Sequence, residues 1–110
     1  MATEKPFVAV VLYESASDSP DYRTLYREDF VLVFARDEEE AREMARQRAE
    51  RESGSHHNER GELITLSLKH IVDVAPALDD DLGRGGDLYA RHFTDFDAYR
   101  RFEPLLSEKD

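Results

Sequence analysis

Two adjacent histidines, His56 and His57, come closest in this chain to the ingredients of a metal or acid–base site. A zinc site needs three or four nitrogen, sulfur or carboxylate ligands that converge on one ion. Side chains of neighbouring residues diverge, so this pair needs a further ligand that folding brings in, such as Glu62 or His70. No HExxH motif or comparable histidine spacing supports such a site. We therefore interpret the surrounding segment, SGSHHNERGE, as a polar connection between a helix and a strand, with metal binding as the alternative.

His70 is a second candidate for acid–base chemistry. It interrupts an otherwise apolar face of a predicted strand. Catalysis would need a carboxylate to orient the imidazole and a nucleophile within reach. Asp73 lies three residues further on, and strict alternation along the strand places it on the opposite face. We interpret His70 as a hydrogen-bonded core or interface residue.

An aromatic and charged cluster is the candidate binding site. Tyr89 and Arg91 alternate along a predicted strand and therefore share a face, with Tyr13, Tyr26 and Glu28 as expected neighbours. Tyrosine and arginine dominate the hot spots of protein interfaces. In the alternative interpretation, Tyr89 belongs to the core and Arg91 is an exposed neighbour that pairs with an acid.

Two glycine-containing segments are interpreted as loops. Asn58 to Gly61 fits a tight turn with Gly61 at positive φ. The acidic residues around GRGG, at 79–81 and 87, lack the spacing of an EF-hand. The lysine and serine or threonine of a phosphate-binding loop are also missing, so a solvated hairpin loop is expected there.

Composition limits the classes of function. The 110 residues are enough for one α+β domain, with a core at about residues 7–103 and short flexible termini. The absence of cysteine excludes disulfides and thiolate chemistry and suits a cytoplasmic protein. A net charge of −10 disfavours nucleic acid and favours a basic protein partner. No signal peptide, membrane span or cofactor is expected.

The periodicity predicts four strands and two helices. Strands are expected over residues 7–13, 25–35, 62–74 and 87–93. Asp37 and Glu40 have capping-box spacing and predict a helix over 38–53, which Gly54 ends and whose apolar stripe is Ala41, Met44, Ala45 and Ala49. Thr94 is expected to cap a short C-terminal helix. The fold class is therefore α+β: a mainly antiparallel four-stranded sheet in the order β-β-α-β-β, with the long helix on one face.

The first two strands are apolar on both sides, but only one long helix is available to cover them. The second face must be covered by the short aromatic helix, by a second copy of the chain or by a partner protein. We expect a homodimer.

Several short motifs follow one another in a characteristic order. They are FVAVVLYE, an acidic helix start at Asp37 to Ala41, an Asn-x-x-Gly-Glu turn at Asn58, Gly61 and Glu62, a strand end at Asp73 and Val74, and a closing strand with Leu88, Tyr89 and Arg91. In this order they resemble a small bacterial family, the domain of unknown function 4288. The resemblance covers about residues 7–93 and departs at Leu66, where tryptophan is expected, and at residues 75–77. It implies no activity.

Two functional hypotheses follow. The first is a non-catalytic cytoplasmic binding or assembly module, homodimeric, that engages a basic protein as immunity proteins and antitoxins do. The second is a small metal-dependent hydrolase built from nearby carboxylates and the four histidines, His56, His57, His70 and His92. The first is preferred because no convergent catalytic set is visible.

Overall fold

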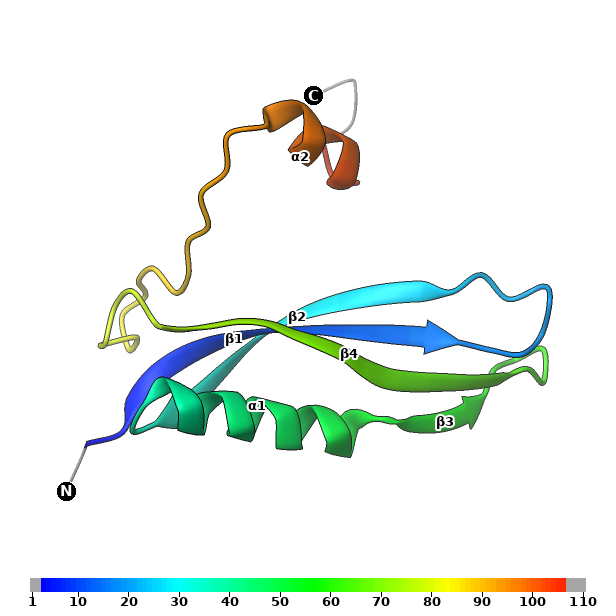
Figure 1. The fold of residues 1–110 in the computed structure, drawn as a ribbon, viewed down its shortest axis with the longest axis horizontal. Helices are drawn as coiled ribbons and strands as arrows, with labels where there is room; N and C mark the ends of the chain where they lie inside the picture. The colour runs from blue at the N-terminus through cyan, green and yellow to red at the C-terminus, as the bar shows by residue number, and fades with distance from the viewer. Residues whose placement is uncertain (1–2, 107–110) are drawn as a thin grey trace.

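The computed structural model describes residues 3–106 as a curled antiparallel sheet with one long helix packed against it (Figure 1). The strands lie in the order β2-β1-β4-β3, so β1 and β4 are central. The elements are, in chain order, β1 (Lys5–Ala16), β2 (Leu25–Ala35), α1 (Glu38–Glu52), β3 (Gly54–His57), β4 (Leu63–Pro76) and α2 (Phe96–Phe102).

The predicted fold class is confirmed, and so are three of the four predicted strands. The strand expected at 25–35 has the observed bounds, and the strand expected at 7–13 extends by two residues at its start and three at its end. The strand expected at 62–74 begins one residue later and ends two residues later. The fourth strand of the sheet, however, is β3 and not residues 87–93. The interpretation of SGSHHNERGE as a mere connection was therefore wrong in its first half.

Side-chain exposure explains why residues 54–57, and not 87–93, were overlooked as a strand. All four residues of β3 are exposed, so they carry no apolar alternation, and only their pairing with Leu63–Leu66 of β4 makes them a strand. Residues 87–93 belong to no strand. Two backbone hydrogen bonds join this segment to the residues that follow β4. They run from the Leu78 N–H to the Leu88 carbonyl and from the Asp79 N–H to the Asp87 carbonyl.

Helix α1 begins where the capping residues predict. The Asp37 carboxylate accepts from the Glu40 N–H at 2.8 Å, as an N-cap should. Glu40 reaches back one residue further than expected, to the backbone N–H and the guanidinium of Arg36. The helix ends at Glu52, and Ser53, with an extended backbone, is its C-cap. Gly54 does not adopt the left-handed conformation expected of a glycine that ends a helix.

Small side chains fix how closely α1 approaches the sheet. Ala41, Ala45 and Ala49 are buried, whereas Met44, expected in the same stripe, is 37% exposed. The alanines pack on a face of the sheet that we call the helix face. Its core residues on the strands are Phe7, Ala9, Val11, Tyr13, Val33, Ala35 and Val74.

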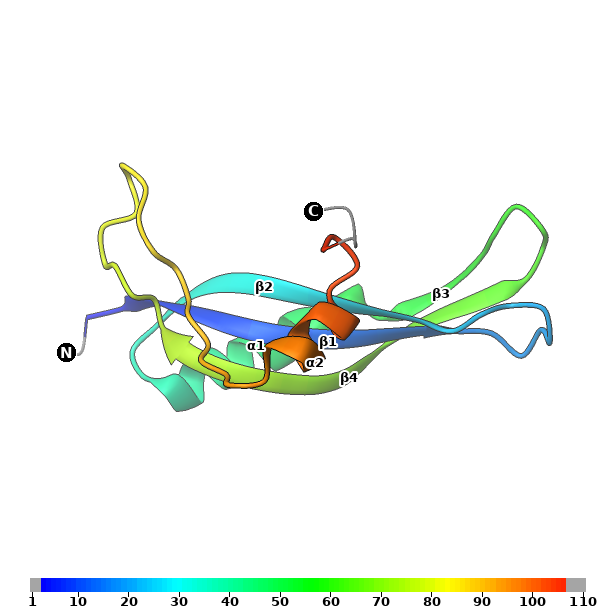
Figure 2. The same ribbon diagram turned by 90° about the horizontal axis from the view of Figure 1, so that it is seen from above.

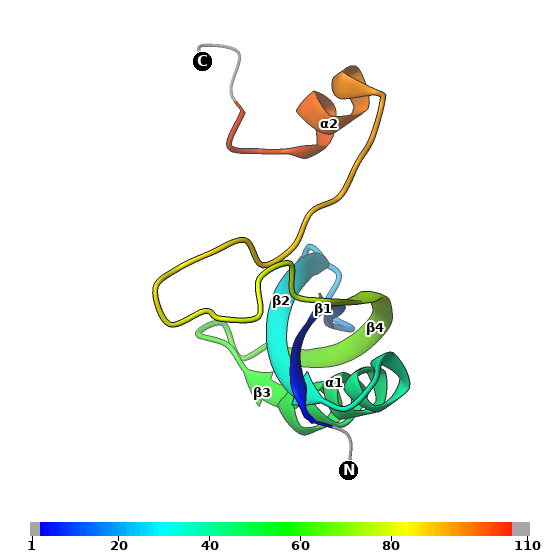
Figure 3. The same cartoon turned by 90° about the vertical axis from the view of Figure 1, so that its left-hand side faces the viewer.

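The C-terminal helix α2 stands away from the sheet. Figures 1 and 3 both show it separated from the strands, on the side opposite α1. None of its residues is buried, and its N-cap is Asp95, which accepts from the Ala98 N–H at 3.0 Å, rather than Thr94. The Cα radius of gyration is 17.2 Å, against about 13 Å for a compact domain of this length.

The alanine stripe generates a stability prediction. Ala45→Leu should lower the free energy of unfolding by about 1–3 kcal/mol, because α1 has no room for a larger side chain against the sheet. Gln47→Leu introduces the same residue on the exposed side of α1 and is the matched control. Urea unfolding of both variants checks this, and equal stability of the two would contradict close packing.

Candidate functional site

Two β-bulges in β4 decide which side chains share a face of the sheet. The register between β1 and β4 shifts between Val10 and Val11 and again between Leu12 and Tyr13. As a result Asp73 pairs with Val10 and His70 pairs with Leu12, and both lie on the side away from α1. We call this side the open face; it contains Val8, Val10, Leu12, Phe30, Leu32, Phe34, His70 and Asp73.

The placement of His70 by strict alternation was therefore wrong. His70 is exposed on the open face and shares it with Asp73. Asp73 does not orient the imidazole, however, because its carboxylate accepts from the Tyr89 hydroxyl at 2.5 Å and from the Val74 N–H at 2.9 Å.

The Tyr89–Asp73 hydrogen bond attaches the C-terminal segment to the open face. The Tyr89 ring also lies 6.0 Å from the Phe30 ring, and the chain around Tyr89 lies beside Val8, which is buried. The pKa of Tyr89 is raised, first because its hydroxyl donates to Asp73 and then by partial burial, against an opposing effect of Arg91. Tyr89 is thus a protonated hydrogen-bond donor near neutral pH.

The four residues predicted to bind a partner occupy two positions on this face. Tyr89, Arg91 and Glu28 are neighbours, since Arg91 and Glu28 both influence the pKa of Tyr89. Tyr26 lies further along β2, where the Lys69 ammonium sits 5.8 Å from its ring centroid. Tyr13, another expected neighbour, is buried on the helix face instead.

An apolar hollow of about 470 Å³, open to solvent, lies beside Tyr89. Segment 86–91 forms one wall and β1 and β2 the other, with Val8, Phe30 and Leu32 among the lining residues. Beyond it the open face of β2 stays exposed: Phe30 is 63%, Leu32 44% and Phe34 51% accessible. The sequence predicted a second apolar face on the first two strands that needs a cover, but the residues predicted to bind a partner did not include these three.

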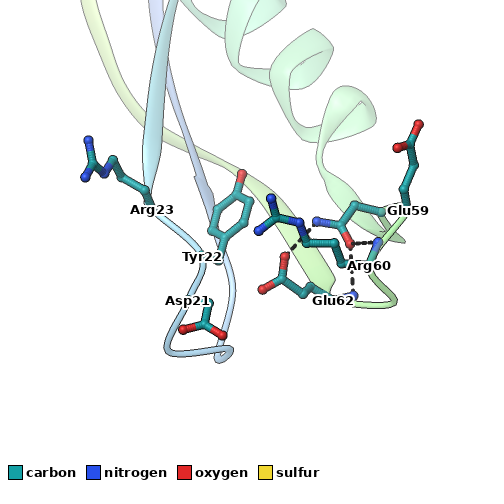
Figure 4. A pocket seen from close by; sticks show the side chains of 7 residues that line it. Asp21, Tyr22, Arg23, Glu59, Arg60 and Glu62 are labelled. Atoms are coloured by element: carbon teal, nitrogen blue, oxygen red, sulfur yellow. Dashed lines mark hydrogen bonds between the residues drawn. The ribbon is translucent and has the colours of Figure 1, made fainter.

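A second hollow, of about 450 Å³, lies at the far end of the sheet between the β1–β2 loop and the β3–β4 turn (Figure 4). Tyr22, Arg60 and Glu62 point toward one another there, whereas Arg23 and Glu59 point outward. Glu62 accepts from the Asn58 side chain at 2.9 Å and from the Ser19 hydroxyl at 2.5 Å.

The Asn-x-x-Gly-Glu motif builds this turn. The Asn58 side-chain oxygen accepts from the N–H groups of Arg60 and Glu62, each at 3.0 Å, and Gly61 adopts φ +78° as predicted. The pKa of Glu62 is lowered by the hydrogen bonds from Asn58 and then Ser19. An ionised carboxylate of this kind carries no proton to donate near neutral pH, so Glu62 is unsuited to general acid catalysis.

The histidines do not converge. His56 and His57 are consecutive in β3 and so point to opposite sides of the sheet, and His92 is exposed beyond Tyr89. Among residues 3–106, no group of three or more His, Asp or Glu side chains is placed to hold a metal ion. This part of the chain therefore offers no ligand set to the hydrolase hypothesis.

Comparison with known proteins identifies the family. A model described as a domain of unknown function, DUF4288, matches residues 6–90. The chain belongs to this family. The comparisons with curated proteins and with solved structures give no match. The DUF4288 region includes the Asn58 turn, Asp73 and Tyr89, and it ends just after Tyr89, so α2 lies outside it. In the described part of the chain, neither helix is long and apolar enough to cross a membrane.

The hydrogen bonds to Glu62 predict a pH dependence. Because the pKa of Glu62 is lowered in the folded chain, its contribution to stability is present above the carboxyl pKa of the unfolded chain. That contribution is lost as pH falls through the folded pKa. Asn58→Ala should raise the pKa of Glu62, and Ser19→Ala should raise it by less.

Carboxyl ¹³C NMR titration measures this directly. Glu59→Gln is the control, because Glu59 lies in the same turn and points away from the hollow. An unchanged pKa of Glu62 in both the Asn58 and Ser19 variants would contradict the assigned cause.

Proposed function

We propose that this DUF4288 protein is a non-catalytic assembly module that forms a homodimer through its open face. The observation that carries the proposal is the exposure of Phe30, Leu32 and Phe34 side by side on an edge strand. Each of these residues lies on the same side of β2, because they alternate with Val31 and Val33 of the helix face. Contiguous apolar surface of this kind marks an interaction site in soluble proteins.

The open face is covered only in part, and its exposed part supports this function. Val8 and Val10 in the middle of β1 are buried, and segment 86–91 lies beside Val8, but Phe30, Leu32 and Phe34 in the β2 half of the face stay exposed. A basic protein other than a second copy of this chain is the alternative partner, and the net charge of −10 favours it. Such a complex would form at low salt and dissociate at high salt, which a pull-down with a salt gradient tests.

Two leucines provide a matched pair of variants for the dimer. Leu32 on the open face is 44% exposed and Leu63 on β4 is 43% exposed, and both lie in strands. Leu32→Glu should weaken dimerisation by about 100-fold or more, because a carboxylate would be buried in the interface without a partner. Leu63→Glu should leave dimerisation unchanged, because Leu63 begins β4 beside the β3–β4 turn, whereas Leu32 lies level with Ala75 near the other end of β4.

Size-exclusion chromatography with light scattering measures the mass. The unsubstituted chain is expected at twice 12.7 kDa at high micromolar concentration, and Leu32→Glu at 12.7 kDa with unchanged circular dichroism. A wild-type chain that remains at 12.7 kDa would overturn the proposal.

A further inference from the structure

Residues 90–106 form a segment that we call the C-terminal arm, and it carries a second exposed apolar surface. Phe96, Tyr99 and Phe102 recur every third residue on α2, and Phe93 stacks on Tyr99 with ring centroids 4.9 Å apart. Phe102 is 75% exposed, and Leu105 is exposed too. A two-turn helix that buries none of its aromatic residues has too little packing of its own to remain ordered alone, so it needs a surface to dock on.

The chain just before the arm is attached to the open face, whereas helix α2 of the arm does not pack on the sheet. Tyr89 is fixed to the open face by Asp73 and Phe30, and the chain then leads away from the sheet. Figure 2 shows α2 overlying the sheet in projection, whereas Figures 1 and 3 show it apart from the strands. The arm therefore reaches from its own open face into the space where an associated molecule would lie.

The same chain thus has two apolar surfaces without a partner: the arm and the exposed β2 half of the open face. We infer that two copies exchange arms, with α2 of each copy packed on Phe30, Leu32 and Phe34 of the other. The inference rests on the proposed dimer and specifies what occupies its interface. Because each copy supplies both surfaces, a two-fold axis satisfies all of them and closes the assembly.

The area available favours exchange over a one-sided contact. Each arm and the strand surface that it covers would bury about 750 Å² together, taking about 200 Å² for a large apolar side chain and the observed exposures. One such contact is of the size of crystal-packing contacts, whereas two bury about 1,500 Å², the size of a standard stable interface. A foreign partner that received a single arm would not reach this area.

The absence of cysteine from the sequence makes disulfide trapping a clean test. One chain carries Phe34→Cys, on the open face, and the other carries Ala98→Cys, on α2. After mixing and mild oxidation, the two chains should form a covalent heterodimer. A chain with Glu43→Cys replaces the Phe34→Cys chain in the control, because Glu43 is exposed on α1 and, unlike Gln47, does not line a hollow with Leu32 and Phe34. This chain should not cross-link to Ala98→Cys above background.

A doubly substituted chain separates exchange from folding back. If the arm docks on its own sheet, the chain with both cysteines forms an internal disulfide and stays monomeric, and the mixed chains do not cross-link. That result overturns the exchange, as does cross-linking no stronger than that of the Glu43→Cys control.

Light scattering on the unsubstituted chain distinguishes failure of the exchange from failure of the proposed function. A dimer that lacks the Phe34–Ala98 cross-link but is still weakened by Leu32→Glu means that the open faces pair without exchange of arms, and only the exchange fails. A monomer means that both fail. As a second readout, combined Phe96→Ser, Tyr99→Ser and Phe102→Ser should raise the dimer dissociation constant about 100-fold or more without changing the fold, because none of the three is buried in one chain.

Discussion

The rest of the structure depends on a central strand that is apolar on both sides. Phe7, Val11 and Tyr13 of β1 face α1, and Val8 and Val10 face away from it, and all five are buried. One helix with an alanine stripe lies close to one side and can cover no more than that side. Everything on the other side, from Tyr89 to the exposed phenylalanines of β2, follows from the need to remove the second apolar surface from water.

The family motifs have structural roles. Asn58, Gly61 and Glu62 close the β3–β4 turn, where the carboxamide of Asn58 bonds both the backbone and the Glu62 carboxylate. Asp73 and Tyr89 are 16 residues apart and meet in a hydrogen bond that holds segment 86–91 over β1. Both sets fix chain connections that cover or end the sheet, which is consistent with a scaffold whose interface lies beside them.

Sequence patterns predicted the elements that their own side chains determine. Asp37 and the alanines define α1, and the apolar runs define β1, β2 and β4. The patterns failed where pairing with another strand determines the secondary structure. The polar residues of β3 form a strand only because β4 pairs with them. Residues 87–93 have strand-like composition but pair with no strand of the sheet. The bulges opposite Val10 and Leu12 moved His70 and Asp73 onto one face, which no alternation rule reveals.

The most direct measurement of the central claim compares the solvent accessibility of Leu32 and Leu63 by methyl NMR with a water-soluble paramagnetic probe. In one isolated chain the two side chains are equally exposed, at 44% and 43%. The account predicts that in concentrated solution the probe broadens Leu63 strongly and Leu32 weakly, and that dilution makes the two alike. Equal broadening of both leucines at every concentration would show that the open face remains in contact with water and would contradict the account.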